Sequence, residues 1–87
     1  QEIRKVQLET ETFVKNEMAD IYSRELIELL FEQPYCKISF LVDRHIAKKQ
    51  TASKYLNRLV AAGLLDKTKQ GREYYFINKN LWEILTR

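Results

Sequence analysis

The chain has few of the residue types that organise many other small proteins. Its 87 residues include one cysteine, one histidine, two glycines and one proline. The single Cys36 cannot form an intramolecular disulfide, and together with the single His45 it cannot supply the ligands of a structural zinc site. This use of cysteine is typical of a reducing compartment, so we expect a cytoplasmic protein without a metal site.

Long apolar segments are absent as well. A membrane-spanning helix needs about 20 consecutive apolar residues, and no stretch of this sequence approaches that length. The first residues, QEIRKVQLETETF, are charged throughout, unlike a secretory signal. We therefore expect no membrane partner. Because the first residue is Gln rather than Met, we also expect the chain to be a piece of a longer protein.

The sequence has no arrangement typical of an active site. Asp43 and His45 are close in sequence, but an Asp-x-His spacing in a short helix does not aim the carboxylate at the ring. The two glycines, Gly63 and Gly71, fall at predicted turns, so there is no glycine-rich phosphate loop. We predict that this chain is not an enzyme by itself, has no catalytic residue and binds no cofactor.

What the sequence does contain is a strong amphipathic helix at residues 50–63, QTASKYLNRLVAAG. Its apolar side chains recur at i, i+4, i+7 and i+8 and share one face: they are Ala52, Leu56, Leu59 and Val60. Gly63 suits the left-handed residue that often follows a helix. The opposite face is polar and basic. The function of the chain depends on which molecule this face contacts.

A leading helix is predicted over residues 2–17, which contain neither Gly nor Pro. Its thin apolar stripe consists of Ile3, Val6, Phe13 and Val14. Such a helix packs on the rest of the domain, on a second copy or on upstream sequence, and we favour the last two. We accordingly divide the chain into a linker helix at residues 1–20 and a domain at residues 21–87.

Two more helices are predicted before the amphipathic helix. Ser23 is expected to cap a core helix, SRELIELLFEQ, which Pro34 ends. A short helix with the apolar residues Ile38, Leu41 and Val42 follows, with Ser39 as its expected cap. A turn at residues 45–47 then leads into the amphipathic helix. A short helix, a tight turn and a second helix form the outline of a helix-turn-helix.

A hairpin and a last helix complete the chain. LLDKT is predicted to begin a strand with Leu65 pointing inward, KQGR to form a turn, and REYYFIN to form the returning strand. Asn78 is expected to cap a final helix whose apolar residues close the core: Leu81, Trp82, Ile84 and Leu85. The element order predicts a mainly α winged helix-turn-helix with a small β-hairpin, preceded by a long N-terminal linker helix.

The charge is distributed unevenly along the chain. Residues 1–36 contain four Lys/Arg and eight Asp/Glu, a net charge of −4, whereas residues 37–87 contain eleven and four, a net charge of +7. A basic half on a small domain is typical of a nucleic-acid-binding protein. An ordinary lysine-rich solvated surface gives the same composition, so charge alone does not decide.

The segments IYSRELIELLFEQPYCKI, IAKKQTASKYLNRLVAAGLL and GREYYFIN resemble the C-terminal winged-helix module of bacterial Fic-family proteins over about residues 21–85. In that family a preceding catalytic domain carries a His-Pro-Phe-x-(Asp/Glu)-Gly-Asn-Gly-Arg loop, which transfers AMP from ATP to protein hydroxyls. This loop is not in the chain. The resemblance implies a regulatory domain of a protein adenylyltransferase, with the upstream catalytic domain as its partner and with ATP and Mg²⁺ as cofactors of that catalytic domain.

The polar face of the amphipathic helix and the tip of the hairpin are the predicted DNA interface. Short hydroxyls and cations at a helix N-terminus can meet phosphates, Gln50 and Asn57 can read adenine, and Lys54 or Arg58 can read guanine. Lysines are disfavoured at the positive end of a helix dipole, which suggests an anionic partner. The candidate residues are Lys48, Lys49, Gln50, Thr51, Ser53, Lys54, Asn57, Arg58, Lys69 and Arg72.

The alternative function is protein docking or dimerisation without DNA binding. Winged helices serve this purpose too, and fold alone does not settle function. The aromatic residues Tyr74, Tyr75 and Trp82 are candidate anchors for a partner, which includes a second copy of the chain. In a domain of this size, aromatics at alternating strand positions more often belong to the core.

Overall fold

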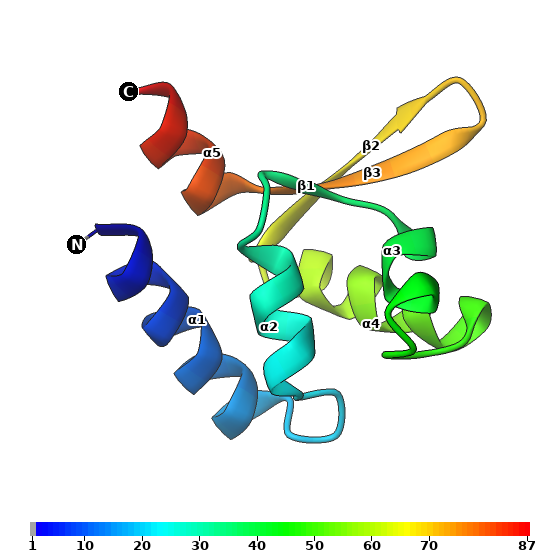
Figure 1. Cartoon of the computed structure of the whole chain (residues 1–87), viewed down its shortest axis with the longest axis horizontal. Coiled ribbons are helices and arrows are strands. Elements are labelled where there is room, and N and C mark those ends of the chain that lie inside the picture. The colour runs from blue at the N-terminus through cyan, green and yellow to red at the C-terminus, as the bar shows by residue number, and fades with distance from the viewer. Residues whose placement is uncertain (1) are drawn as a thin grey trace.

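The computed structural model describes residues 2–87, which form five α-helices and a three-stranded antiparallel sheet (Figure 1). The predicted winged helix-turn-helix is confirmed, since a helical layer is followed by a hairpin and one more helix. In order, the elements are α1 (Glu2–Glu17), α2 (Arg24–Leu30), β1 (Tyr35–Cys36), α3 (Ile38–Asp43), α4 (Lys49–Ala61), β2 (Leu65–Gln70), β3 (Glu73–Asn78) and α5 (Lys79–Thr86).

The sheet has the strand order β1-β3-β2, with β3 in the centre. The hairpin of β2 and β3 is the predicted wing, in register from Leu65 opposite Asn78 to Gln70 opposite Glu73. Gly71 turns the hairpin at φ +63°, a conformation that glycine adopts without a Cβ clash. The two-residue strand β1, which pairs Cys36 with Phe76, was not predicted because two residues cannot display a strand pattern.

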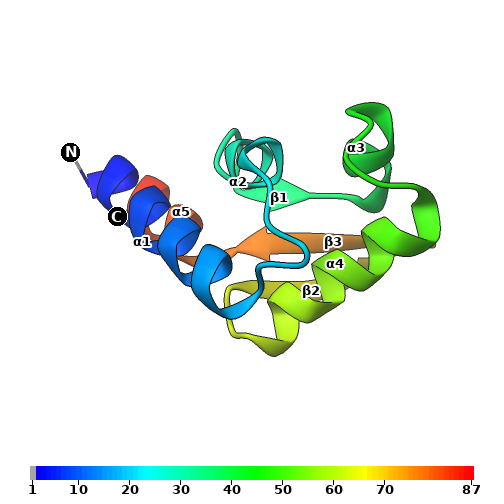
Figure 2. The same cartoon turned by 90° about the horizontal axis from the view of Figure 1, so that it is seen from below.

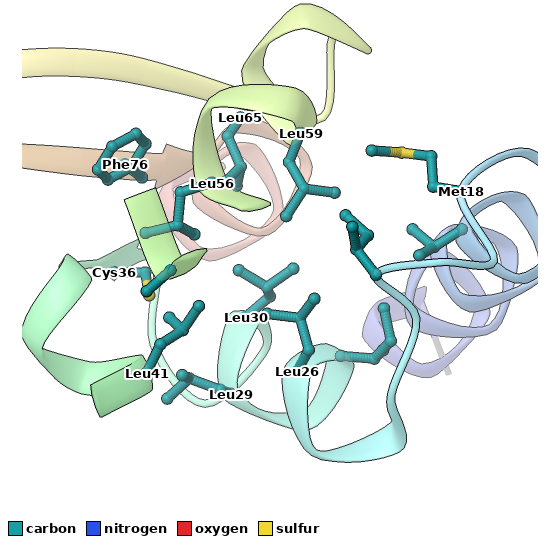
Figure 3. Packing of buried hydrophobic residues seen from close by; sticks show 14 residues of the cluster. Met18, Leu26, Leu29, Leu30, Cys36, Leu41, Leu56, Leu59, Leu65 and Phe76 are labelled. Atoms are coloured by element: carbon teal, nitrogen blue, oxygen red, sulfur yellow. The ribbon is translucent and has the colours of Figure 1, made fainter. Parts of the chain in front are cut away.

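One hydrophobic core lies between the helices and the inner face of the sheet (Figure 3). Phe76 from β3 and Leu56 from α4 are both completely buried, and Leu30 from α2 is 2% exposed. Side chains alternate between the two faces of β3, so Tyr74 and Phe76, two residues apart, lie on the same face. Phe76 is buried in the core, whereas Tyr74 is 41% exposed because it lies closer to the hairpin tip, beyond the core. Fully burying such side chains contributes about 1.5–3 kcal/mol each to folding.

The leading helix α1 packs on α2 and α5. Val14 in α1 is completely buried. In the loop that follows α1, Met18 (Figure 3) and Ile21 are also buried and belong to the core. The hydroxyl of Tyr22 also donates a hydrogen bond to Glu11 at 2.6 Å. Packing on the rest of the domain is thus the arrangement found, whereas the role of residues 1–20 as a linker stays a prediction.

The predicted packing of the last helix is wrong in part. Of its four apolar residues only Leu81 is buried; Trp82 is 51% and Leu85 54% exposed. The physical reason is the position of α5, which leaves the sheet at the end of β3 (Figure 1) and packs against α1, so that Leu81 in its first turn is buried whereas Trp82 and Leu85 are not. The outer face of α5 is therefore apolar and uncovered in this domain.

Two helix boundaries also differ from the prediction. Lys37, rather than Ser39, is the N-cap residue of α3, and its side chain makes no capping hydrogen bond. Helix α2 ends at Leu30, three residues before Gln33, because Phe31 and Glu32 already form a turn before Pro34. The predicted cap of α2 is confirmed, since Ser23 Oγ accepts a hydrogen bond from the Leu26 amide at 3.1 Å.

Cys36 is the only thiol, and it is 1% exposed. Burial raises its pKa to about 12, so at pH 8 only about one molecule in ten thousand carries the reactive thiolate. We expect iodoacetamide at pH 8 to leave Cys36 unmodified in the folded protein and to modify it fully in denaturant, as read by mass spectrometry. Rapid modification without denaturant would contradict the position of β1.

Within residues 2–87, no helix has the length and hydropathy needed to span a bilayer. The same residues contain no group of three or more His, Cys, Asp or Glu side chains that could hold a metal ion.

Candidate nucleic-acid interface

Helices α3 and α4 form the helix-turn-helix. The turn between them is tight: His45 adopts φ +58°, which is uncommon for a residue other than glycine, and the Ile46 amide donates to the Leu41 carbonyl at 2.9 Å. Ala52 and Leu59, on one face of α4, are completely buried. This fixes the rotation of α4 and turns its polar face outward.

The N-terminal half of that polar face is open. The residues Lys48, Lys49, Gln50, Thr51 and Lys54 are all exposed. Lys48 is the N-cap residue of α4, and its side chain makes no hydrogen bond to the first turn. Among residues 2–87, no ion pair is found for these three lysines. The positive charge at this end of α4 therefore adds to the helix dipole without a carboxylate to neutralise it.

The C-terminal half of the polar face already has partners. The Asn57 amide donates to the Ser53 carbonyl at 2.8 Å and accepts a hydrogen bond from Lys67 Nζ at 2.9 Å. Arg58 forms an ion pair with Asp20 in the loop between α1 and α2. This contact lowers the pKa of Asp20 and raises that of Arg58. In this structure Asn57 and Arg58 hold α4 in place instead of pointing freely at a ligand.

The wing carries the second group of predicted residues. Lys69 and Arg72 are exposed near its tip. Lys67 and Lys69 stack over the ring of Tyr74, with their Nζ atoms 4.4 Å and 5.6 Å from the ring centroid. The hairpin tip lies at the same end of the molecule as the N-terminus of α4, which Figure 2 and Figure 1 both show.

A groove of about 540 Å³ separates α3 and the start of α4 from the wing. It brings together Lys49 and Arg72, two candidate residues that are far apart in sequence. It is lined by Lys37, Ile38, Ser39, Val42, Lys49, Arg72, Glu73 and Tyr74. The surface of the groove is mostly apolar, and its lining includes three basic residues, Lys37, Lys49 and Arg72, against one acidic residue, Glu73.

Sequence reasoning missed Lys37 as a residue of this groove. Its Nζ lies 3.0 Å from Glu73 Oε2 and 4.9 Å from the centroid of the Tyr75 ring. The hydrogen bond to Lys37 lowers the pKa of Glu73. Since the pair is exposed, it adds little to stability, but it joins the start of α3 to the wing. No spacing in the sequence signals this contact, because it depends on how the sheet packs against α3.

Ion pairs occupy most basic side chains elsewhere on the molecule. They join Arg24 to Glu28, Arg44 to Glu32, Arg58 to Asp20, Lys79 to Asp66, and Arg87 to both Glu2 and Glu83. Within residues 2–87, no ion pair is found for Lys69 and Arg72, as for Lys48, Lys49 and Lys54. The unneutralised positive charge of the C-terminal half is thus concentrated on α4 and the wing.

A family model described as "Protein adenylyltransferase SoFic-like, C-terminal domain" matches residues 6–81. The match runs from the first turns of α1 to α5 and so includes the helix-turn-helix, the groove and the wing. The resemblance inferred from the sequence is confirmed. The chain belongs to this family: it is the C-terminal domain of a Fic-family protein adenylyltransferase and not its catalytic Fic domain.

Proposed function

We propose that this domain binds double-stranded DNA through α4 and the wing. The observation that carries the proposal is the cluster of exposed cations without ion pairs on these two elements, which we call the basic face: Lys48, Lys49, Lys54, Lys69 and Arg72. A helix-turn-helix places its second helix in the major groove, with the N-terminal residues of that helix nearest the bases. Here those residues are the open part of α4.

The side chains divide into three roles. Lys48, Lys49, Lys69, Arg72 and the hydroxyl of Thr51 contact phosphates, which fixes the register of the domain on the duplex. Gln50 and Lys54 reach base edges, where Gln pairs with adenine and Lys with guanine. Asn57 and Arg58, which have internal partners, act through the position of α4. Ser53 lies half-buried between the open and the occupied halves of the helix.

In the whole protein, this domain positions or regulates the AMP-transferring part. ATP and Mg²⁺ are cofactors of that upstream part and not of this domain. We further propose that the protein is bacterial and works in the cytoplasm, where both ATP and DNA are accessible to it.

Titration of a labelled duplex at several salt concentrations tests the proposal. If three to five cations contact phosphates, log K should fall with log[salt] with a slope of about −2.7 to −4.5. Binding should then weaken about 40- to 500-fold between 50 and 200 mM salt. An absence of binding even at 50 mM salt would contradict DNA binding.

A specific observation favours the alternative of protein docking at the same groove. Two of its lining residues are exposed apolar or aromatic side chains, Val42 at 37% and Tyr74 at 41%. A partner segment that is acidic and carries an apolar anchor would fit the basic and the apolar residues that line the groove. Failure to bind a duplex, together with retention of such a peptide, would favour this docking function over DNA binding.

A further inference from the structure

The outer face of α5 exposes two large apolar side chains that the fold does not use. Trp82 is 51% and Leu85 54% exposed. They are three residues apart, so they lie on one face of the helix. The only tryptophan of the chain is one of them, and tryptophan is the residue type most enriched at the centres of protein interfaces. Because the two side chains are adjacent, they form one small apolar patch on α5 instead of two isolated exposed residues.

Ion pairs near the end of α5 show where Trp82 and Leu85 lie relative to the start of α1. Arg87, just after α5, contacts Glu2 at the start of α1 and lies 3.2 Å from Glu83. The start of α1 and the end of α5 therefore lie next to each other, at the same side of the molecule in Figure 1. Trp82 precedes Arg87 by five residues, or about 7.5 Å along the helix axis.

The size of the pair argues against an independent partner. Half of a large side chain leaves roughly 100 Å² exposed, so Trp82 and Leu85 together offer on the order of 200 Å². A stable interface between separate proteins buries about 800 Å² on each side. A tethered partner needs much less, because a short connection gives an effective concentration in the millimolar range.

We propose that Trp82 and Leu85 dock the domain onto the upstream part of the same polypeptide. Because this is the C-terminal domain of a protein adenylyltransferase, the rest of the protein joins it through the start of α1, beside the end of α5. The upstream part is therefore the partner that is always near this face. The contact sets how the domain is held against the catalytic part and leaves the basic face uncovered.

Helix α5 lies at one end of the longest axis in Figure 1, and the N-terminus of α4 and the hairpin tip lie at the other. The inference is thus independent of DNA binding: either can fail in its own test while the other stands.

Hydroxyl-radical footprinting of the full-length adenylyltransferase, read by mass spectrometry, tests the inference with Trp82 as the reporter. After correction for the higher intrinsic reactivity of tryptophan, Trp82 should be oxidised several-fold less than Tyr74, which is 41% exposed at the far end of the domain. The variant Leu85→Glu places a charge in the contact and keeps the reporter, so it should raise the oxidation of Trp82 several-fold.

Val42→Glu is the matched control, since Val42 is also an exposed apolar residue but lies on α3. It should leave Trp82 protected. Equal oxidation of Trp82 in the wild type and in Leu85→Glu would overturn the inference. So would protection that increases with protein concentration, because that result would identify a second copy as the partner. If Leu85→Glu lowers the melting temperature, Leu85→Ser replaces it, and the comparison of Trp82 with Tyr74 in the wild type still decides.

Discussion

Replacing Lys48, Lys49 and Lys54 with Glu is expected to abolish duplex binding and to leave the domain folded. Lys48 and Lys49 are the phosphate contacts of this set, and each accounts for about one unit of the salt slope. Losing both of them together with the base contact of Lys54 should lower affinity at 50 mM salt at least about 100-fold. The added carboxylates repel the phosphates and increase this loss. Fluorescence anisotropy with a labelled duplex measures the affinity.

The fold should tolerate these changes because all three side chains are exposed and have no ion pair within the described residues 2–87. Acidic residues are also better suited than lysine to the first turn of a helix. The melting temperature should therefore stay constant or rise slightly. A loss of folding would mean that the outer side of α4 is structural.

A control with the same change in net charge separates the basic face from general electrostatics. Lys5, Lys15 and Arg24 are exposed on α1 and α2, and their replacement by Glu changes the total charge by the same amount. This variant should bind the duplex far more tightly than the α4 variant. Equal weakening in both variants would show that net charge, and not the basic face, accounts for binding.

Asn78→Ala is expected to destabilise the domain by about 2–4 kcal/mol. The side chain, only 6% exposed, makes two hydrogen bonds. Its Oδ1 accepts from the Leu81 amide at 3.2 Å, which caps α5, and its Nδ2 donates to the Leu30 carbonyl at the end of α2 at 2.9 Å. Loss of a cap costs about 1 kcal/mol, and a buried carbonyl without its donor costs about 1–3 kcal/mol more.

Urea unfolding monitored by circular dichroism measures this effect. Asn80→Ala, at an exposed position in the first turn of the same helix, is the matched control and should change stability by less than about 0.5 kcal/mol. Asn78→Asp keeps the capping acceptor but loses the donor, so it separates the two contributions. A stability of Asn78→Ala equal to that of the wild type would show that α5 is not anchored to α2 through this residue.

The parts of the fold that could be predicted from the sequence depend on local patterns. The apolar period of α4 predicted its buried face, and Ser23 and Asn78 predicted the starts of α2 and α5 because a capping side chain acts within its own first turn. The uncovered face of Trp82 and Leu85 could not be predicted. An amphipathic pattern shows that a face is apolar, but not whether its partner belongs to the same domain.

The candidate interface was predicted only as far as α4 and the wing tip. The side chains on the polar face of the N-terminal half of α4 are exposed, as the sequence predicted. The internal partners of Asn57 and Arg58 could not be foreseen, because Lys67 and Asp20 come from elements 10 and 38 residues away. The same limit applies to the groove, where Lys37 meets the wing across 36 residues of sequence. Contacts of this kind follow from tertiary packing.

The outline of the domain has a consequence for where a segment attached to α1 would begin. The molecule measures 33 Å along its longest axis. The wing lies at one end of this axis, and the start of α1 and the end of α5 lie at the other (Figure 1). If the wing end of the domain is seated on a duplex, the start of α1 lies at the opposite end of this 33 Å axis. A polypeptide segment attached to α1 would then begin on the side of the domain that faces away from the DNA.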